Sequence, residues 1–129
     1  MRKTIIEDYV SFETAKLLKE KGFEGRMHTF YTEEGTEMES AYVVPSNFFP
    51  IYRPTIQMAM KWLREVHNLY ISVEMGFDVD NPQYFFFVPS VCKFSNKDGE
   101  YFTPFSEMEF NTYEDAAELA IKYCLENLI

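Results

Sequence analysis

Cysteine and histidine are scarce in this chain. Its 129 residues include two of each, and neither cysteine belongs to a C-x-x-C pair. A disulfide-stapled secreted fold and a zinc site both need more of these residues at short spacing. A zinc site would require His28, His67, Cys92 and Cys124 to converge from distant parts of the chain. We therefore expect no metal and no cofactor, and we expect the two thiols to be reduced and buried.

Long apolar runs and basic side chains are also few. No stretch approaches the roughly 20 apolar residues of a membrane span, and the first residues lack the apolar core of a signal peptide. Both absences predict a cytoplasmic location, in a bacterial cell. Twelve basic residues stand against 21 acidic ones, so the net charge is −9, and sixteen of the acidic residues follow residue 26. This charge disfavours nucleic-acid binding, and it suits either a basic protein partner or simple solubility.

Catalytic motifs are missing from the sequence. It contains no G-x-S-x-G, no P-loop and no G-x-G-x-x-G. The stretch 78–81 begins like a calcium loop, but Gln83 stands where such a loop needs glycine and Pro89 where it needs glutamate. His67 lies at the edge of an apolar helical stripe, which is typical of a hydrogen-bonded structural histidine. No carboxylate stands in an apolar context that would raise its pKa, so we expect a protein without enzymatic activity.

What the chain does have is apolar and aromatic residues. They make up 47% and 18% of it, with thirteen Phe, nine Tyr and one Trp. A chain of this length and composition predicts one folded domain spanning residues 1–129. Its few glycines and prolines mark element boundaries.

Three helices are predicted from caps and apolar periodicity. The first runs from Phe12 to Lys21 between an N-cap at Ser11 and the helix stop at Gly22. The second follows Thr55 and leads directly into a strand that begins at Leu69. The third follows Thr112 and carries a stripe of small and apolar residues.

Strand patterns lie between these helices. Ranges 27–32 and 36–44 predict a hairpin around Gly35, and 69–74 predicts a strand after the second helix. Ranges 84–88, 91–95 and 100–103 predict three more, with Pro89 interrupting the first two and Gly99 in the last turn. We expect both glycines to adopt backbone angles that other residues avoid. The order α-ββ-α-β-βββ-α predicts an α+β fold, with an antiparallel or mixed sheet of about five to six strands covered mainly on one face.

Three segments carry a resemblance. They are the helical stretches 10–19 (Val-Ser-Phe-Glu-Thr-Ala-Lys-Leu-Leu-Lys), 54–65 (Pro-Thr-Ile-Gln-Met-Ala-Met-Lys-Trp-Leu-Arg-Glu) and 120–128 (Ala-Ile-Lys-Tyr-Cys-Leu-Glu-Asn-Leu). Together the chain resembles a group of small uncharacterised proteins from gut Bacteroidales and the phages and prophages that infect them. The resemblance implies a phage or mobile-element setting, and it implies neither an activity nor catalytic residues.

Two binding hypotheses follow, and they differ in class. In the first, a phage-associated inhibitor or adaptor binds a basic host protein through the acidic hairpin that carries Glu33, Glu34, Glu37 and Glu39, as a partial mimic of nucleic acid. In the alternative, the aromatic loop 48–53 stacks a nucleotide-like small molecule. That loop supplies Phe48, Phe49, Tyr52 and Arg53. A flat apolar patch rimmed by carboxylates would favour the first hypothesis, and a deep aromatic pocket would favour the second.

Tyr84 to Val88 is apolar at every position, so a strand there would be covered on both faces. Three helices are few for that task. Two arrangements can hide the second face: the loop between Phe48 and Tyr52 folds back on the sheet, or a second copy of the chain covers it as a homodimer.

Overall fold

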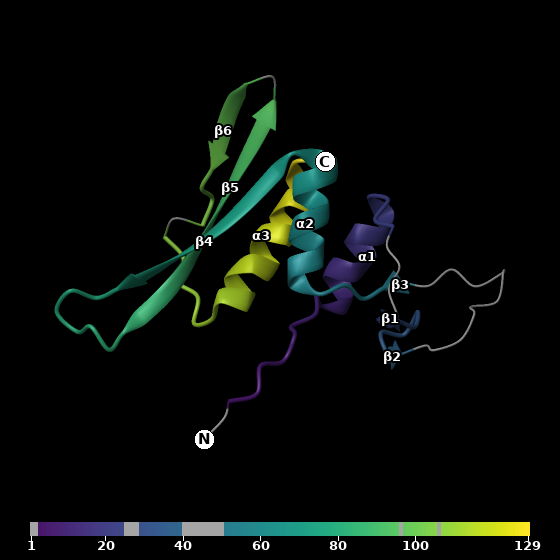
Figure 1. Ribbon diagram of the computed structural model, residues 1–129, viewed down its shortest axis with the longest axis horizontal. Coiled ribbons are helices and arrows are strands. Elements are labelled where there is room, and N and C mark those ends of the chain that lie inside the picture. The colour runs from purple at the N-terminus through teal and green to yellow at the C-terminus, as the bar shows by residue number, and fades with distance from the viewer. Residues whose placement is uncertain (1–2, 25–28, 40–50, 96, 106) are drawn as a thin grey trace.

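The computed structural model describes residues 3–24, 29–39, 51–95, 97–105 and 107–129. Figure 1 shows its elements, and in chain order they are α1 (Phe12–Glu20), β1 (Thr29–Tyr31), β2 (Glu37–Glu39), β3 (Ile51–Tyr52), α2 (Ile56–His67), β4 (Leu69–Phe77), β5 (Phe85–Ser95), β6 (Asp98–Phe102) and α3 (Tyr113–Asn127). The α+β class is confirmed. Within the described ranges, none of the helices is long and apolar enough to cross a membrane.

All three predicted helices form, and each begins at the predicted cap. The side chains of Ser11, Thr55 and Thr112 accept hydrogen bonds from the backbone N–H groups three residues further on. These bonds satisfy donors that the first turn of a helix leaves unpaired. α2 ends at Asn68, whose left-handed backbone turns the chain directly into β4.

The prediction of a single sheet is wrong. The six strands form two separate antiparallel sheets, in the orders β2-β1-β3 and β4-β5-β6. The short strand β3 comes from the end of the Pro-rich segment, where the sequence predicts a loop. In β3, Ile51 and Tyr52 pair with β1. The described end of that segment therefore joins the small sheet and does not cover the second face of the large one.

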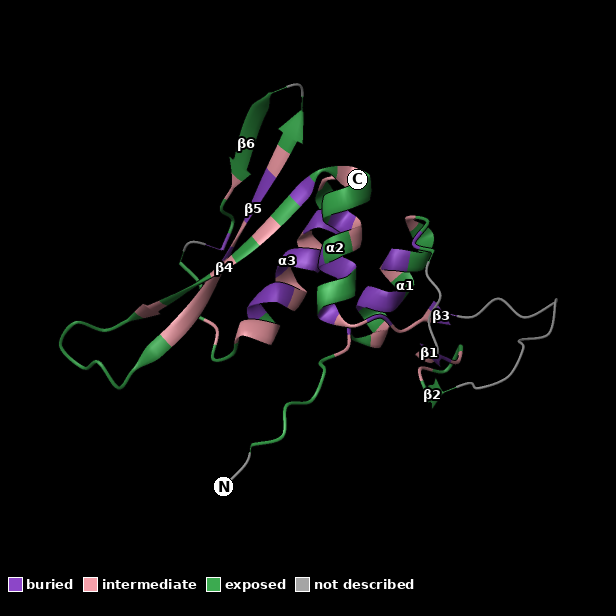
Figure 2. Ribbon diagram, viewed as in Figure 1, coloured by how far each residue is buried: buried purple, intermediate pink, exposed green. Residues whose placement is uncertain are grey.

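The helices lie between the two sheets. α2 and α3 pack on one face of the β4-β5-β6 sheet, and α1 packs on α3 and β3 (Figure 1). Buried residues gather along this interior, as the purple segments of Figure 2 show. The core includes Leu18, Leu63, Leu69, Ile121 and Leu125, all nearly or fully inaccessible.

β5 runs without a break through Pro89, so the prediction of two strands there is wrong. Phe87 exchanges backbone hydrogen bonds with Phe110, at 2.8 and 3.0 Å, and Val91 pairs with Phe102 of β6. Pro89 falls between these two partners on that side of the strand. Its missing N–H therefore removes no bond from either neighbour, and the strand tolerates it.

The two predicted turn glycines differ. Gly35 has φ +88°, as predicted, in a turn closed by the Thr32 and Thr36 backbones. Gly99 lies within β6 and is not among the glycines with positive φ, so that prediction is wrong; Lys97 adopts φ +78° instead. A Cβ at position 99 would stand 3.3 Å from the Cys92 sulfur, so glycine is favoured there by close packing.

Replacing Gly35 with alanine is expected to lower the free energy of unfolding by about 1 kcal/mol or more, because a side chain at positive φ is strained. The added Cβ would also stand 3.1 Å from the Phe12 ring. Urea denaturation followed by circular dichroism measures the change. The neighbouring exposed variant Glu34→Ala should stay within about 0.5 kcal/mol of wild type. Equal stability of both variants would show that the turn carries no strain.

Candidate binding surfaces

The acidic hairpin lies at one end of the molecule. Glu33 and Glu34 occupy the turn, and Glu37 and Glu39 lie on β2, the edge strand of the small sheet; all four are exposed. Glu37 is the member that faces another predicted site residue. Its carboxylate forms an ion pair with the Arg53 guanidinium at 3.3 Å.

Arg53 is held by its neighbours. Its guanidinium lies 4.1 Å over the centre of the Tyr9 ring and 5.6 Å from that of Tyr31. Only 16% of the side chain is exposed. Cation–π contacts of this kind are strongest where water is excluded. The arginine therefore ties the N-terminal segment to the small sheet, and it does not project toward a ligand from a loop.

A hollow of about 280 Å³ opens beside Arg53. We call it the acidic hollow, and carboxylates from the N-terminal segment, β2 and α3 line it: Asp8, Glu37, Glu114, Asp115 and Glu118. The Oε2 oxygen of Glu118 is buried with no hydrogen-bond partner, and so is Nε of Arg53. Five carboxylates around one arginine repel a phosphate group. The acidic hollow therefore disfavours a nucleotide.

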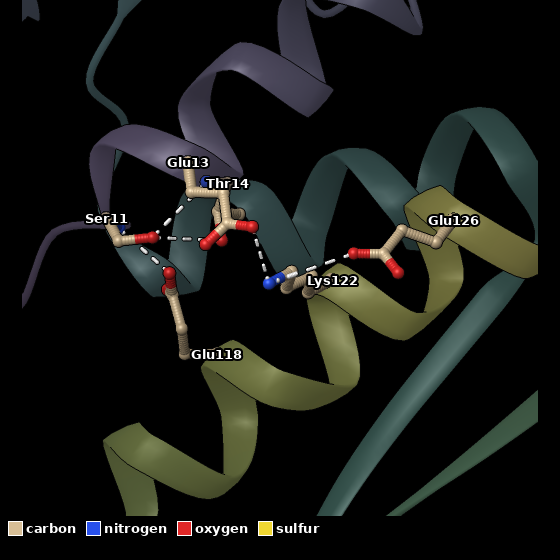
Figure 3. A network of polar contacts seen from close by, with 6 residues as sticks. All are labelled: Ser11, Glu13, Thr14, Glu118, Lys122 and Glu126. Carbon is tan, nitrogen blue, oxygen red and sulfur yellow. Dashed lines mark hydrogen bonds and ion pairs between the residues drawn. The ribbon is translucent and has the colours of Figure 1, made fainter.

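Glu118 of the hollow and two carboxylates outside it, Glu13 and Glu126, have polar partners on α1 and α3 (Figure 3). Oε1 of Glu118 accepts a hydrogen bond from the Ser11 backbone N–H at 2.9 Å, which joins α3 to the start of α1. Lys122 bridges Glu13 at 2.8 Å and Glu126 at 3.9 Å. The hydrogen bond with Lys122 lowers the pKa of Glu13, and the same bond raises the pKa of Lys122. These groups fasten α1 to α3.

The aromatic loop is only partly brought together with the hairpin. Phe48 and Phe49 lie outside the described residues. Tyr52 is half-buried against the core, on β3. The structure therefore places Tyr52, Glu37 and Glu39 in one sheet, with Arg53 directly after β3 and Glu33 and Glu34 in the exposed turn before β2.

A different apolar surface lies on the long β4–β5 hairpin, which extends beyond α3 in Figure 1. We call it the hairpin surface, and its side chains are between 51% and 84% exposed: Met75, Phe77, Val79, Tyr84 and Phe85. Phe77 and Phe85 are directly opposite each other in the strand pairing. The expectation that range 84–88 is covered on both faces is wrong for the described residues, because α3 ends before it reaches the apex of the hairpin.

Carboxylates surround the hairpin surface. Glu74, Asp78 and Asp80 lie on the same hairpin and are exposed. Glu109 accepts a hydrogen bond from the Tyr84 hydroxyl at 3.2 Å, and this bond raises the pKa of Tyr84. In the sequence, this surface is marked by the run of apolar residues at 84–88, which predicts a buried strand.

The cysteine and histidine side chains among the described residues are those of Cys92, Cys124 and His67. Cys92 and Cys124 are free and buried, as predicted. His67 packs edge-on against Trp62, with ring centres 4.7 Å apart, and burial lowers its pKa. Its Nε2 is buried without a partner, so the predicted hydrogen bond is not made by that atom. Within the part of the chain that the structure describes, no group of three or more His, Cys, Asp or Glu side chains is placed to hold a metal ion.

No protein-family model, no curated protein and no solved structure matches this chain. The surfaces just described are therefore the basis on which a function can be proposed.

Proposed function

We propose that this is a non-enzymatic binding protein that presents the hairpin surface to another protein. The observation that carries the proposal is the set of five large apolar side chains, more than half exposed, on a hairpin that extends beyond the helices. Large exposed apolar side chains that gather on one element, with polar groups around them, are typical of protein–protein contacts. The aromatic rings of Phe77, Tyr84 and Phe85 are the residue types that dominate the centres of such interfaces.

The charge around the hairpin surface indicates which surface chemistry the partner would need. Glu74, Asp78, Asp80 and Glu109 form an acidic rim, and the whole chain carries a net charge of −9. A partner with an apolar centre and a basic rim would fit both features, and its association would be faster at low salt. A host protein with a basic surface has this chemistry, and so the acidic inhibitor or adaptor remains the form of the proposal. The phage or mobile-element setting and the bacterial cytoplasm are part of the proposal, and the setting rests on the resemblance.

The alternative proposal is a nucleotide-like ligand on the aromatic loop 48–53. It has less support, because Arg53 is engaged by Tyr9 and Glu37 and adjoins the acidic hollow. Phosphate groups would meet the carboxylates of that hollow before they reached the arginine.

The test is affinity capture from a Bacteroidales lysate with matched variants of the immobilised protein. Val79→Asp and Phe85→Asp add charge to the hairpin surface at exposed positions, so the fold should tolerate them. Each is expected to reduce recovery of the captured protein by about tenfold or more, because a charge at the centre of an apolar interface is desolvated without a partner.

Ile5→Asp is the control. Ile5 is 84% exposed and lies in the N-terminal segment, away from the hairpin in sequence and fold, so its variant should recover the partner as wild type does. Glu33→Lys with Glu34→Lys tests the acidic hairpin separately. Recovery that depends on Glu33 and Glu34 but not on Val79 and Phe85 would contradict the proposal. Retention of a nucleotide, detected by mass spectrometry of the purified protein, would favour the alternative.

A further inference from the structure

β4 is the longest edge strand among the described residues. β4 is an outer strand of its sheet, and within the described ranges no strand pairs with its other side. Asn68 C=O accepts from Phe94 N–H at 3.0 Å, and Asp78 N–H donates to Tyr84 C=O at 3.0 Å. Because backbone direction alternates along a strand, the even-numbered residues between them bond to β5. The backbone groups of the odd-numbered residues point outward: Leu69, Ile71, Val73, Met75 and Phe77.

This edge lacks the protection that sheet edges of monomeric proteins usually carry. Its nine residues read Leu-Tyr-Ile-Ser-Val-Glu-Met-Gly-Phe, with no proline, no lysine and one charge, at Glu74. The pairing with β5 is continuous over all nine positions, so no bulge twists the edge away. Long, apolar, unbroken edges are templates for another strand.

We propose that a second copy of the chain pairs with this edge, β4 against β4 in antiparallel orientation, with Val73 opposite Val73. Val73 is the midpoint of the strand, so this register pairs all nine residues. Each residue whose backbone groups point away from β5 then lies opposite another such residue of the second copy. Val73 lies opposite Val73, Ile71 opposite Met75, and Leu69 opposite Phe77. Every outward N–H and C=O of β4 gains a hydrogen-bond partner. The β4-β5-β6 sheets of the two copies become one continuous six-stranded sheet.

Neighbouring registers fit less well. With Glu74 on the axis, two carboxylates would lie directly opposite each other, which destabilises a strand pair. With Ser72 on the axis, Gly76 and Phe77 would extend past the partner strand. With Val73 on the axis, Glu74 lies opposite Ser72, whose hydroxyl can donate to the carboxylate.

Side chains on both faces of the strand match in this register. On the face away from the helices, Tyr70 of one copy would lie opposite Gly76 of the other, where the Phe86 ring leans over the bare glycine backbone. An aromatic cross-strand neighbour of this kind is a known compensation for glycine in a strand. On the helix-facing side, Met75 and Phe77 would cover the positions opposite Ile71 and Leu69.

A second copy is the occupant favoured by symmetry and by area. Two copies related by a two-fold axis present the same strand to each other, so the strand must be complementary to itself. In β4 the outward N–H and C=O groups pair with each other, and Glu74 lies opposite Ser72 and not opposite a second carboxylate. Tyr70 and Phe77 each leave about half of a ring in water, which is on the order of 100 Å² apiece. Both copies contribute these rings and a strand about 30 Å long, so the pairing reaches the scale of about 1,000 Å² that a stable interface needs.

This inference does not rest on the proposed function. Met75 and Phe77 belong to both surfaces, but the edge pairing depends on the backbone of β4, whereas Val79 and Phe85 at the apex of the hairpin serve the proposed partner contact alone. A monomer that still captures a partner, or a dimer that captures none, would separate the two.

The first experiment is cysteine cross-linking of the full chain under mild oxidation. In Val73→Cys the new thiols of two copies lie opposite each other, at a Cα separation of about 5.5 Å that a disulfide spans. We expect a disulfide-linked dimer on a non-reducing gel. Ser72→Cys is the matched control: its thiol would face Glu74 and should give no dimer. Cross-linking at Ser72 and not at Val73 would overturn the register, and the native cysteines are buried and should not contribute.

The second experiment measures the dimer dissociation constant by analytical ultracentrifugation. Ser72 is exposed, so a charge there leaves the fold intact. Ser72→Lys places an opposite charge beside Glu74 of the second copy and should tighten the dimer about fivefold, whereas Ser72→Glu should weaken it about tenfold. The double variant Ser72→Glu with Glu74→Lys should restore wild-type affinity. Wild-type protein that stays monomeric over the whole concentration range measured, or that pairs only with an added β-strand peptide, would overturn the proposal.

Discussion

The variant Leu63→Ala is expected to lower the free energy of unfolding by about 3 kcal/mol, within the range of about 2–5 kcal/mol found for buried leucines. Leu63 is fully buried in the core, on the stripe of α2 that also carries Ile56, Ala59 and Met60. α2 packs on both β4 and α3, so a cavity at this position lies where the helix layer meets the sheet. Apolar contact is lost, and the close-packed neighbours can collapse only in part.

Met58→Ala is the matched control on the same helix. Met58 is about 40% exposed, so its loss should cost less than about 1 kcal/mol. Urea denaturation of the wild type and both variants gives the three free energies of unfolding. A loss of 3 kcal/mol is a large part of the 5–15 kcal/mol by which a domain is usually stable. Equal effects of the two substitutions would show that α2 is not anchored at Leu63.

The helices could be predicted from the sequence because their signals are local. Each N-cap hydroxyl bonds to a backbone N–H three residues away, so Ser11, Thr55 and Thr112 are sufficient to mark where the helices begin. The junction of α2 and β4 was also local, since the change from helical to alternating periodicity falls at Asn68.

The division into two sheets could not be predicted, because pairing is decided by distant residues. β3 is two residues long and has no pattern of its own; it forms because its partner β1 is adjacent in space. Likewise, Pro89 is tolerated in β5 because the segments on that side of the strand pair with Phe87 and Val91 and not with position 89. A strand pattern shows which face is apolar but not which segment covers it.

The candidate site residues show the same limit. Glu33, Glu34 and Glu39 are exposed as an acidic hairpin should be, since polar residues around a turn are read locally. The partners of Arg53 could not be predicted locally. Tyr9 lies 44 positions earlier in the sequence, and only the fold brings its ring against the guanidinium. The hairpin surface was missed for a related reason, because the apolar run 84–88 looks the same whether a helix, a second chain or water lies over it.

Cys124 is expected to make the protein's stability fall in alkaline solution. The thiol is fully buried on α3, and burial raises its pKa to about 12. In the unfolded chain the same thiol loses its proton near pH 8.5–9. Above that pH the folded state holds one proton more than the unfolded state, so the free energy of unfolding decreases with rising pH, by about 1.4 kcal/mol per pH unit. The stabilisation is complete below about pH 8.5 and is lost as the pH approaches 12.

Cys124→Ala isolates this contribution, because the other groups that titrate in alkali are the same in both proteins. Between pH 8.5 and pH 11, the free energy of unfolding of the wild type should fall by about 3 kcal/mol more than that of the variant. Urea denaturation in the presence of a reducing agent, at closely spaced pH values, measures both curves. Alanine fits among Ala120, Ile121 and Leu125 without a polar atom, so the variant should remain folded at neutral pH. Parallel curves over this range would mean that the Cys124 thiol reaches water in the folded protein, and that α3 is not sealed against the sheet at this position.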